Sequence, residues 1–138
     1  MILGFKITLS QQESIKIFNK IIDKDIKSLI SNDLISHYFT PGDLINLYNF
    51  SLEKKIDLSN MKLKEFLLEI IDNHHYKKDV LSINFIFAFF QMYFIKEISN
   101  LDNYSLYTKF VNSINDIKRF NLDIESLFIQ LRHQIVND

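Results

Sequence analysis

The order of hydrophobic and polar positions predicts helices along almost the whole chain. Hydrophobic residues recur every three or four positions, the spacing that lines one face of an α-helix, over residues 10–24, 26–38, 40–52, 63–73, 78–98, 104–117 and 124–135. Residues 4–9 alternate in the manner of a strand, and one isolated strand is not stable in water. The pattern therefore predicts an all-α protein of about seven helices after a short N-terminal strand or leader.

Polar residues at three predicted helix starts agree with this division. Ser10 and Glu13 have the spacing of a capping box, in which each side chain binds the backbone N–H of the other residue. Thr40 can cap the helix that follows it, because Pro41 fits the first helical position. Asp123 precedes the last hydrophobic stripe and is a suitable N-cap. These three positions are predicted to begin helices.

The most polar interruption of the pattern is the segment 53–58, EKKIDL. It predicts a boundary between a three-helix unit with a short leader strand, residues 1–56, and a helical bundle of four helices, residues 57–138.

The most apolar stretch, residues 80–95, contains Ser82, Asn84 and Gln91 and is shorter than the ~20 residues of a transmembrane helix. We expect it to form the buried centre of the bundle, with Phe87 and Phe90 in the core.

Composition excludes several classes of function. The chain of 138 residues has no Cys, so we expect no disulfide framework, cysteine-bound zinc, iron–sulfur cluster or thiol nucleophile. Its only glycines, Gly4 and Gly42, cannot form the glycine-rich loops that bind nucleotide phosphates. The net charge of −1 lacks the basic excess of an autonomous nucleic-acid-binding domain. We therefore expect no nucleotide, no other cofactor and no sequence-specific contact with nucleic acid.

Two histidines form the one cluster that resembles a metal site. His74 and His75 are flanked by Asp72 and Asp79. Adjacent side chains on a helix point about 100° apart, so both rings rarely reach one ion. No H-E-x-x-H pattern is present. We expect a polar helix end and no metal ligands.

Other candidates for chemistry have simpler structural interpretations. Arg132 and His133 lack the spacing of the helical nucleases in which an Arg precedes a His by four to six residues, so they are expected on the solvated face of the last helix. The carboxylates of Asp23, Asp25, Asp33 and Glu53 are expected in solvent. Dense aromatic residues on an apolar helix are expected to pack in the core rather than line a ligand pocket: Phe85, Phe87, Phe89, Phe90, Tyr93 and Phe94. No catalytic residue is predicted.

The order of elements resembles a known family. A short strand leads into a capped helix (GFKITLSQQESIKIFNKII), and a later turn opens another helix (TPGDLINLYNF). Near the end, RFNLDIESLF places an N-L-D sequence before an amphipathic helix. These segments resemble the C-terminal half, lid plus collar, of the bacterial DNA polymerase III delta-prime clamp-loader subunit.

The resemblance implies an AAA+ lid-like unit over residues 1–56 and a collar-like bundle over residues 57–138. It implies a non-catalytic assembly role in DNA replication, in the cytoplasm and away from any membrane. The implied partners are the gamma-type and delta subunits of the loader, or further copies of this chain. Nucleotide-binding relatives carry a sensor Arg in the lid turn, where this chain has Asp43. The Walker A loop, the zinc-binding cysteines and the finger Arg of the family's core are also missing, which puts any nucleotide contact in doubt.

Two other classes of protein compete with this interpretation. A small helical effector, antitoxin or inhibitor would bind one partner and would form one compact domain with an exposed apolar groove. A helical hydrolase would have a concave pocket with converging titratable groups. A clamp-loader lid and collar would instead form a front unit and a separate back bundle.

Overall fold

The protein is all-α. The computed structural model describes residues 10–36, 39–77, 81–96, 101–120 and 123–136. Within these ranges, no strand longer than an isolated bridge occurs, and the elements are α1 (Gln11–Ile22), the 3₁₀-helix η1 (Ile26–Ser28), α2 (Pro41–Lys54), α3 (Leu63–Asp72), α4 (Ile83–Lys96), α5 (Leu101–Phe120) and α6 (Ile124–Val136). The strand expected over residues 4–9 lies outside the described residues.

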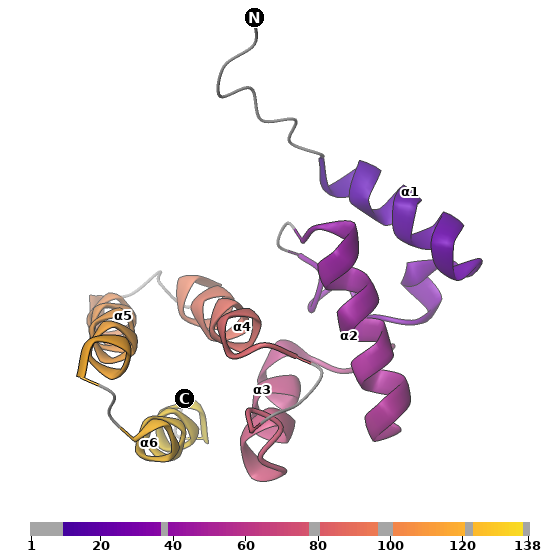
Figure 1. Ribbon diagram of the computed structural model, residues 1–138. Helices are drawn as coiled ribbons and strands as arrows, with labels where there is room; N and C mark the ends of the chain where they lie inside the picture. The colour runs from indigo at the N-terminus through magenta and orange to yellow at the C-terminus, as the bar shows by residue number, and fades with distance from the viewer. Residues whose placement is uncertain (1–9, 37–38, 78–80, 97–100, 121–122, 137–138) are drawn as a thin grey trace, which may run out of the picture. The chain divides into compact units, whose positions relative to one another are not determined.

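The chain forms two compact units, which are labelled by their helices in Figure 1. Unit 1 is Met1–Lys62 and unit 2 is Leu63–Asp138. The polar segment 53–58 predicted a boundary after residue 56, whereas the structural division follows Lys62 and coincides with the start of α3. The comparison of the two units with a lid and a collar stays a prediction.

The predicted starts of α1 and α2 are confirmed by their capping geometry. Ser10 Oγ accepts a hydrogen bond from the Glu13 N–H at 3.2 Å, and Glu13 Oε1 accepts one from the Ser10 N–H at 3.3 Å. Thr40 and Asp43 repeat this capping box at 3.1 and 3.3 Å, with Pro41 at the first helical position. Each box satisfies backbone donors that a helix start leaves unpaired.

The helix predicted over residues 26–38 is wrong within the described residues. Only η1 is helical there, and turns follow it. Ile30 forms an isolated parallel bridge with Leu58, and the Ser31 N–H donates to the Leu58 carbonyl at 2.8 Å. Ile26, Ile30 and Leu34 are nevertheless fully buried. The spacing of these residues therefore indicates that they are buried. It does not distinguish a helix from turns, which bury the same side chains here.

Unit 1 has its own hydrophobic core between α1, α2 and the turns. The rings of Phe18 and Tyr48 meet edge to face, with centroids 5.9 Å apart. Gln11 joins α1 to the turns, because its Nε2 donates to the Ile35 carbonyl at 2.8 Å and its Oε1 accepts from the Phe39 N–H at 3.0 Å. The fully buried side chains include Phe18, Ile26, Ile30, Leu34, Leu44, Leu47 and Phe50.

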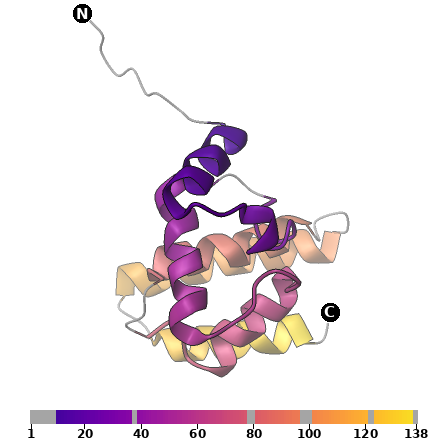
Figure 2. The ribbon, with the colours of Figure 1, turned by 90° about the vertical axis from the view of Figure 1, so that its right-hand side faces the viewer.

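Unit 2 is a four-helix bundle. α4 packs against α3 and α5, and α3 also packs against α6. Figure 1 shows the four helices around one centre, and Figure 2 shows the lengths of α4 and α6 from the side. The prediction that Phe87 and Phe90 lie in this core is confirmed, because both side chains are buried. Phe90 contacts Phe128 of α6 with ring centroids 5.6 Å apart.

The aromatic side chains of α4 serve mainly to pack the bundle. Phe89 contacts Phe66 of α3 at a centroid distance of 4.8 Å, and Phe94 contacts Phe110 of α5 at 5.2 Å. The helix that the pattern predicted over residues 104–117 is longer at both ends, because α5 begins at Leu101 and ends at Phe120. In the part of the chain that the structure describes, no helix combines the length and the apolar character needed to cross a membrane.

Candidate functional site

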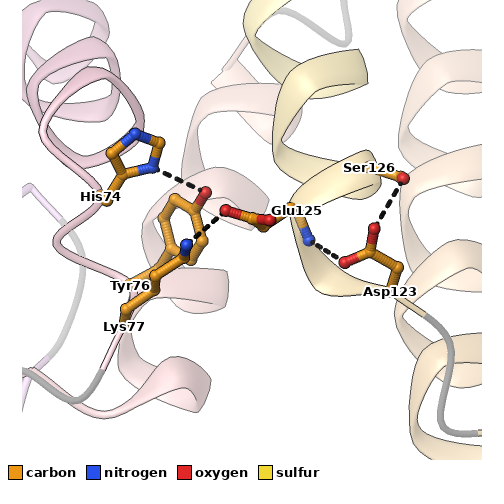
Figure 3. A network of polar contacts seen from close by, with 6 residues as sticks. All are labelled: His74, Tyr76, Lys77, Asp123, Glu125 and Ser126. Carbon is orange, nitrogen blue, oxygen red and sulfur yellow. Dashed lines mark hydrogen bonds and ion pairs between the residues drawn. The ribbon is translucent and has the colours of Figure 1, made fainter.

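The segment after α3 meets the start of α6 in a network of polar contacts, shown in Figure 3. The chain leaves α3 through a left-handed residue, His74, whose φ is 55°. The next N–H, that of His75, donates to the Ile70 carbonyl at 2.9 Å and closes the helix end. We call this network the α3–α6 junction; it comprises His74, Tyr76, Lys77, Asp123, Glu125 and Ser126.

Tyr76 lies at the centre of the junction. Its ring stacks on Phe128 with centroids 4.2 Å apart and an interplanar angle of 19°. Its hydroxyl oxygen lies 3.0 Å from Nδ1 of His74. Burial, together with the nearby Glu125 carboxylate, raises the pKa of the Tyr76 hydroxyl. The hydroxyl therefore stays protonated at neutral pH and serves as a hydrogen-bonding group rather than a general base.

The start of α6 supplies the acidic half of the junction. Asp123 Oδ1 accepts a hydrogen bond from the Glu125 N–H at 3.0 Å, and Oδ2 accepts one from Ser126 Oγ at 3.1 Å. The prediction that Asp123 caps this helix is confirmed. Glu125 then forms an ion pair with Lys77, and its hydrogen bond raises the pKa of the Lys77 ammonium. Lys77 stays charged at neutral pH.

The two candidate metal ligands face different partners. His74 is exposed and contacts the Tyr76 hydroxyl, whereas His75 is 8% exposed and its Nε2 lies 3.6 Å from Glu69 Oε1. Asp79 lies outside the described residues. Across the described ranges, no group of three or more His, Cys, Asp or Glu side chains could hold a metal ion.

Arg132 joins the last helix to α3. The expectation that it lies on a solvated face is confirmed, because both Arg132 and Asp72 are about half-exposed. No pattern in the sequence indicated its partner, Asp72, whose Oδ1 lies 2.6 Å from Arg132 Nε. With Lys77–Glu125, this gives two ion pairs that connect α6 to α3 or to the segment after it.

The contacts of the junction stabilise the packing of α6 against the segment after α3. Its charged and polar groups are directed at one another, and Tyr76 is held in the protonated form. Such an arrangement fixes the position of α6, which in turn places the outer face of that helix. Another molecule would therefore bind to the exposed faces of the helices of unit 2 rather than to the junction.

The described residues of unit 2 line grooves between its helices and include exposed apolar side chains on α6. A groove of about 380 Å³ lies between α4 and α5 and includes Phe87 and Gln91, and another of about 290 Å³ lies between α5 and α6. On α6, Ile129 is 67% exposed and Val136 is 48% exposed. Residues seven apart share a helix face, so these two side chains lie on one face of α6, with the exposed Arg132 and His133 between them.

The junction could not be found from sequence patterns. Lys77 and Glu125 are far apart in the chain, and neither belongs to a local motif that marks such a pair. The one available signal was Asp123, whose capping role indicated where α6 begins.

Comparisons of the chain with protein-family models, with curated proteins and with solved structures find no significant match.

Proposed function

We propose that the chain is a non-catalytic assembly protein that resembles the lid and collar of the clamp-loader delta-prime subunit. In this proposal it acts in DNA replication, in the cytoplasm, through contacts with the gamma-type and delta subunits or with its own copies. It uses no nucleotide, metal or other cofactor. The sequence segments TPGDLINLYNF and RFNLDIESLF suggest the family.

One structural observation carries the proposal. A first helical unit is followed by a separate four-helix bundle, and each has a core of its own. This order suits a lid followed by a collar, although the short 3₁₀-helix η1 stands where the second lid helix was expected. A single compact domain, as expected for a small effector, would divide less clearly. The capping boxes and the α3–α6 junction account for how these short helices keep their positions.

The outer face of α6 is the surface that we assign to subunit contact. Ile129 and Val136 are large apolar side chains that remain exposed in this chain. They lie two turns apart on one helix face with Arg132 and His133 between them, so a partner that contacts this face would meet apolar side chains among polar ones. Helices in a ring of bundles pack side by side, and exposed apolar side chains on one helix face can take part in that packing.

Co-purification of the full chain with gamma-type and delta subunits from the same genome tests this function. We expect a stable complex, and we expect Ile129→Lys with Val136→Lys to weaken it at least tenfold. Because both side chains are exposed, the double variant should fold, which circular dichroism can verify. Gln130→Lys changes an exposed neighbour that points about 100° away on the helix and serves as the matched control.

A chain that captures neither subunit and does not self-associate would overturn the clamp-loader proposal. A helical effector, antitoxin or inhibitor that binds one partner would then be the better account. Capture that is equally strong for the double variant would reject the α6 face while leaving the assembly role in place.

A further inference from the structure

Unit 1 has a groove that its own fold leaves open. It lies between the turn after α1, the end of η1, the second half of α2 and the segment that follows α2, and its volume is about 510 Å³. The groove is open to solvent rather than enclosed, which suits an extended protein segment more than a small molecule. Leu52 lines it and is 58% exposed, although large apolar side chains elsewhere in this unit are mostly buried. The apolar lining consists of Leu29, Leu52, Ile56 and Leu58.

The walls of the groove are held by backbone contacts. Leu58 is buried, and the bridge to Ile30 fixes it beneath the groove. The Ile56 N–H donates to the Ser51 carbonyl at 2.9 Å, which sets the path of the chain as it leaves α2. A binding surface that is already formed loses less entropy when a partner binds.

Two lysines give the groove a positive character. Lys24 and Lys55 line it, and Nζ of Lys24 lies 3.5 Å from the Tyr48 hydroxyl. Asp57 is the one acidic residue in the lining, and its carboxylate accepts hydrogen bonds from the Ser59 N–H at 2.9 Å and from Ser59 Oγ at 2.6 Å. The charged lining residues therefore sum to a net positive charge.

We infer that this groove docks a protein segment that carries acidic residues beside large aliphatic ones. The aliphatic side chains would cover Leu52 and its apolar neighbours, and a carboxylate would lie near Lys24 and Lys55. Electrostatic complementarity of this kind selects the partner and speeds association. The inference rests on the proposed function, in that the chain acts by binding proteins, but it concerns a surface in unit 1 that the α6 contact does not use.

The test uses the full chain, labelled with ¹⁵N, and three synthetic peptides. The first repeats Asp-Leu-Leu-Glu three times; the second replaces the acidic residues with Lys; the third replaces Leu with Ser. We expect the acidic–aliphatic peptide to shift the backbone amide signals of Lys24, Leu52 and Lys55 in a saturable manner. The other two peptides should bind at least tenfold more weakly, because each lacks one of the two complementary features.

Matched variants make the assignment specific. Leu52→Ser and the pair Lys24→Glu with Lys55→Glu should each weaken binding at least tenfold. Ile21→Ser removes a side chain of similar exposure outside the groove, and Lys16→Glu reverses another exposed charge, so both should leave binding unchanged. Circular dichroism of each variant checks that unit 1 remains folded.

Several results would overturn the inference. These are no saturable binding of the first peptide, equal binding of all three, signal shifts confined to unit 2, or equal losses in the control variants. The peptide titration does not involve the clamp-loader subunits. A negative peptide titration therefore does not affect the co-purification test of the proposed function. A negative co-purification likewise does not affect the peptide titration.

Discussion

The ring of Tyr76 stacks on the ring of Phe128, with centroids 4.2 Å apart and planes 19° from parallel. This contact joins the segment after α3 to the first half of α6. The ion pair between Lys77 and Glu125 lies beside the Tyr76 side chain, as Figure 3 shows. An apolar stack with polar pairs around it fixes two segments that are distant in sequence, and it gives α6 one position in the bundle.

Two substitutions of Tyr76 should separate the contribution of its ring from that of its hydroxyl group. Tyr76→Ala should lower the free energy of unfolding by about 3 kcal/mol or more, because it removes a buried ring from the stack. Tyr76→Phe keeps the ring and loses one hydrogen bond to an exposed histidine, so it should cost about 1 kcal/mol or less. Urea denaturation measures both values. Equal losses would show that the hydroxyl, and not the stack, stabilises the junction.

Phe90 is the most direct test of the core of unit 2. Its side chain is fully buried and contacts rings from both α5 and α6. Phe90→Ala should therefore cost about 3–5 kcal/mol. Ile95→Ala, on the same helix but exposed, should cost less than about 1 kcal/mol. If Phe90→Ala costs under about 1 kcal/mol, α4 does not lie in a bundle core and the fold described here is incorrect.

Asp57 should titrate at a lower pH than an ordinary aspartate. The two hydrogen bonds from Ser59 lower the pKa of its carboxyl group. A folded-state pKa below the unfolded value stabilises the fold above the unfolded pKa, and this contribution is lost as pH falls through the folded pKa. NMR titration of the carboxyl carbon should show the depressed value, and Ser59→Ala should raise it. An unchanged pKa in that variant would contradict the assigned cause.

The chain should not bind Mg-ATP. Its two glycines are 38 residues apart and cannot form a phosphate loop, and Asp43 stands in the lid turn where nucleotide-binding relatives of the resembled family carry an Arg. Isothermal titration should show no heat of binding beyond dilution. A micromolar dissociation constant would refute both the composition argument and the comparison of the TPGDL turn with a lid.

Local signals in the sequence predicted much of the fold. Capping residues such as Ser10, Thr40 and Asp123 marked helix starts, because each binds backbone groups within three positions of itself. The apolar stretch around Phe90 indicated the core. The failure over residues 26–38 has a physical cause: the bridge between Ile30 and Leu58 is non-local, and spacing within one segment does not register it.

Local signals in the sequence could not predict the contacts that form the junction and the groove. Lys77 pairs with Glu125, and Arg132 pairs with Asp72, across helices whose packing the sequence pattern does not specify. The exposure of Leu52 was equally hidden, because its position in the hydrophobic stripe of α2 resembled that of a buried residue. Patterns of hydrophobicity indicate which side chains can be buried, and the tertiary contacts decide which of them are.

An assembly component that works through protein contacts must form complexes in solution. Multi-angle light scattering after size-exclusion chromatography, on the chain alone and then mixed with gamma-type and delta subunits, measures their masses. We expect a shared peak whose mass exceeds that of the subunits by whole copies of this 16.5 kDa chain. A chain that elutes as a monomer at every concentration and joins neither subunit would contradict it.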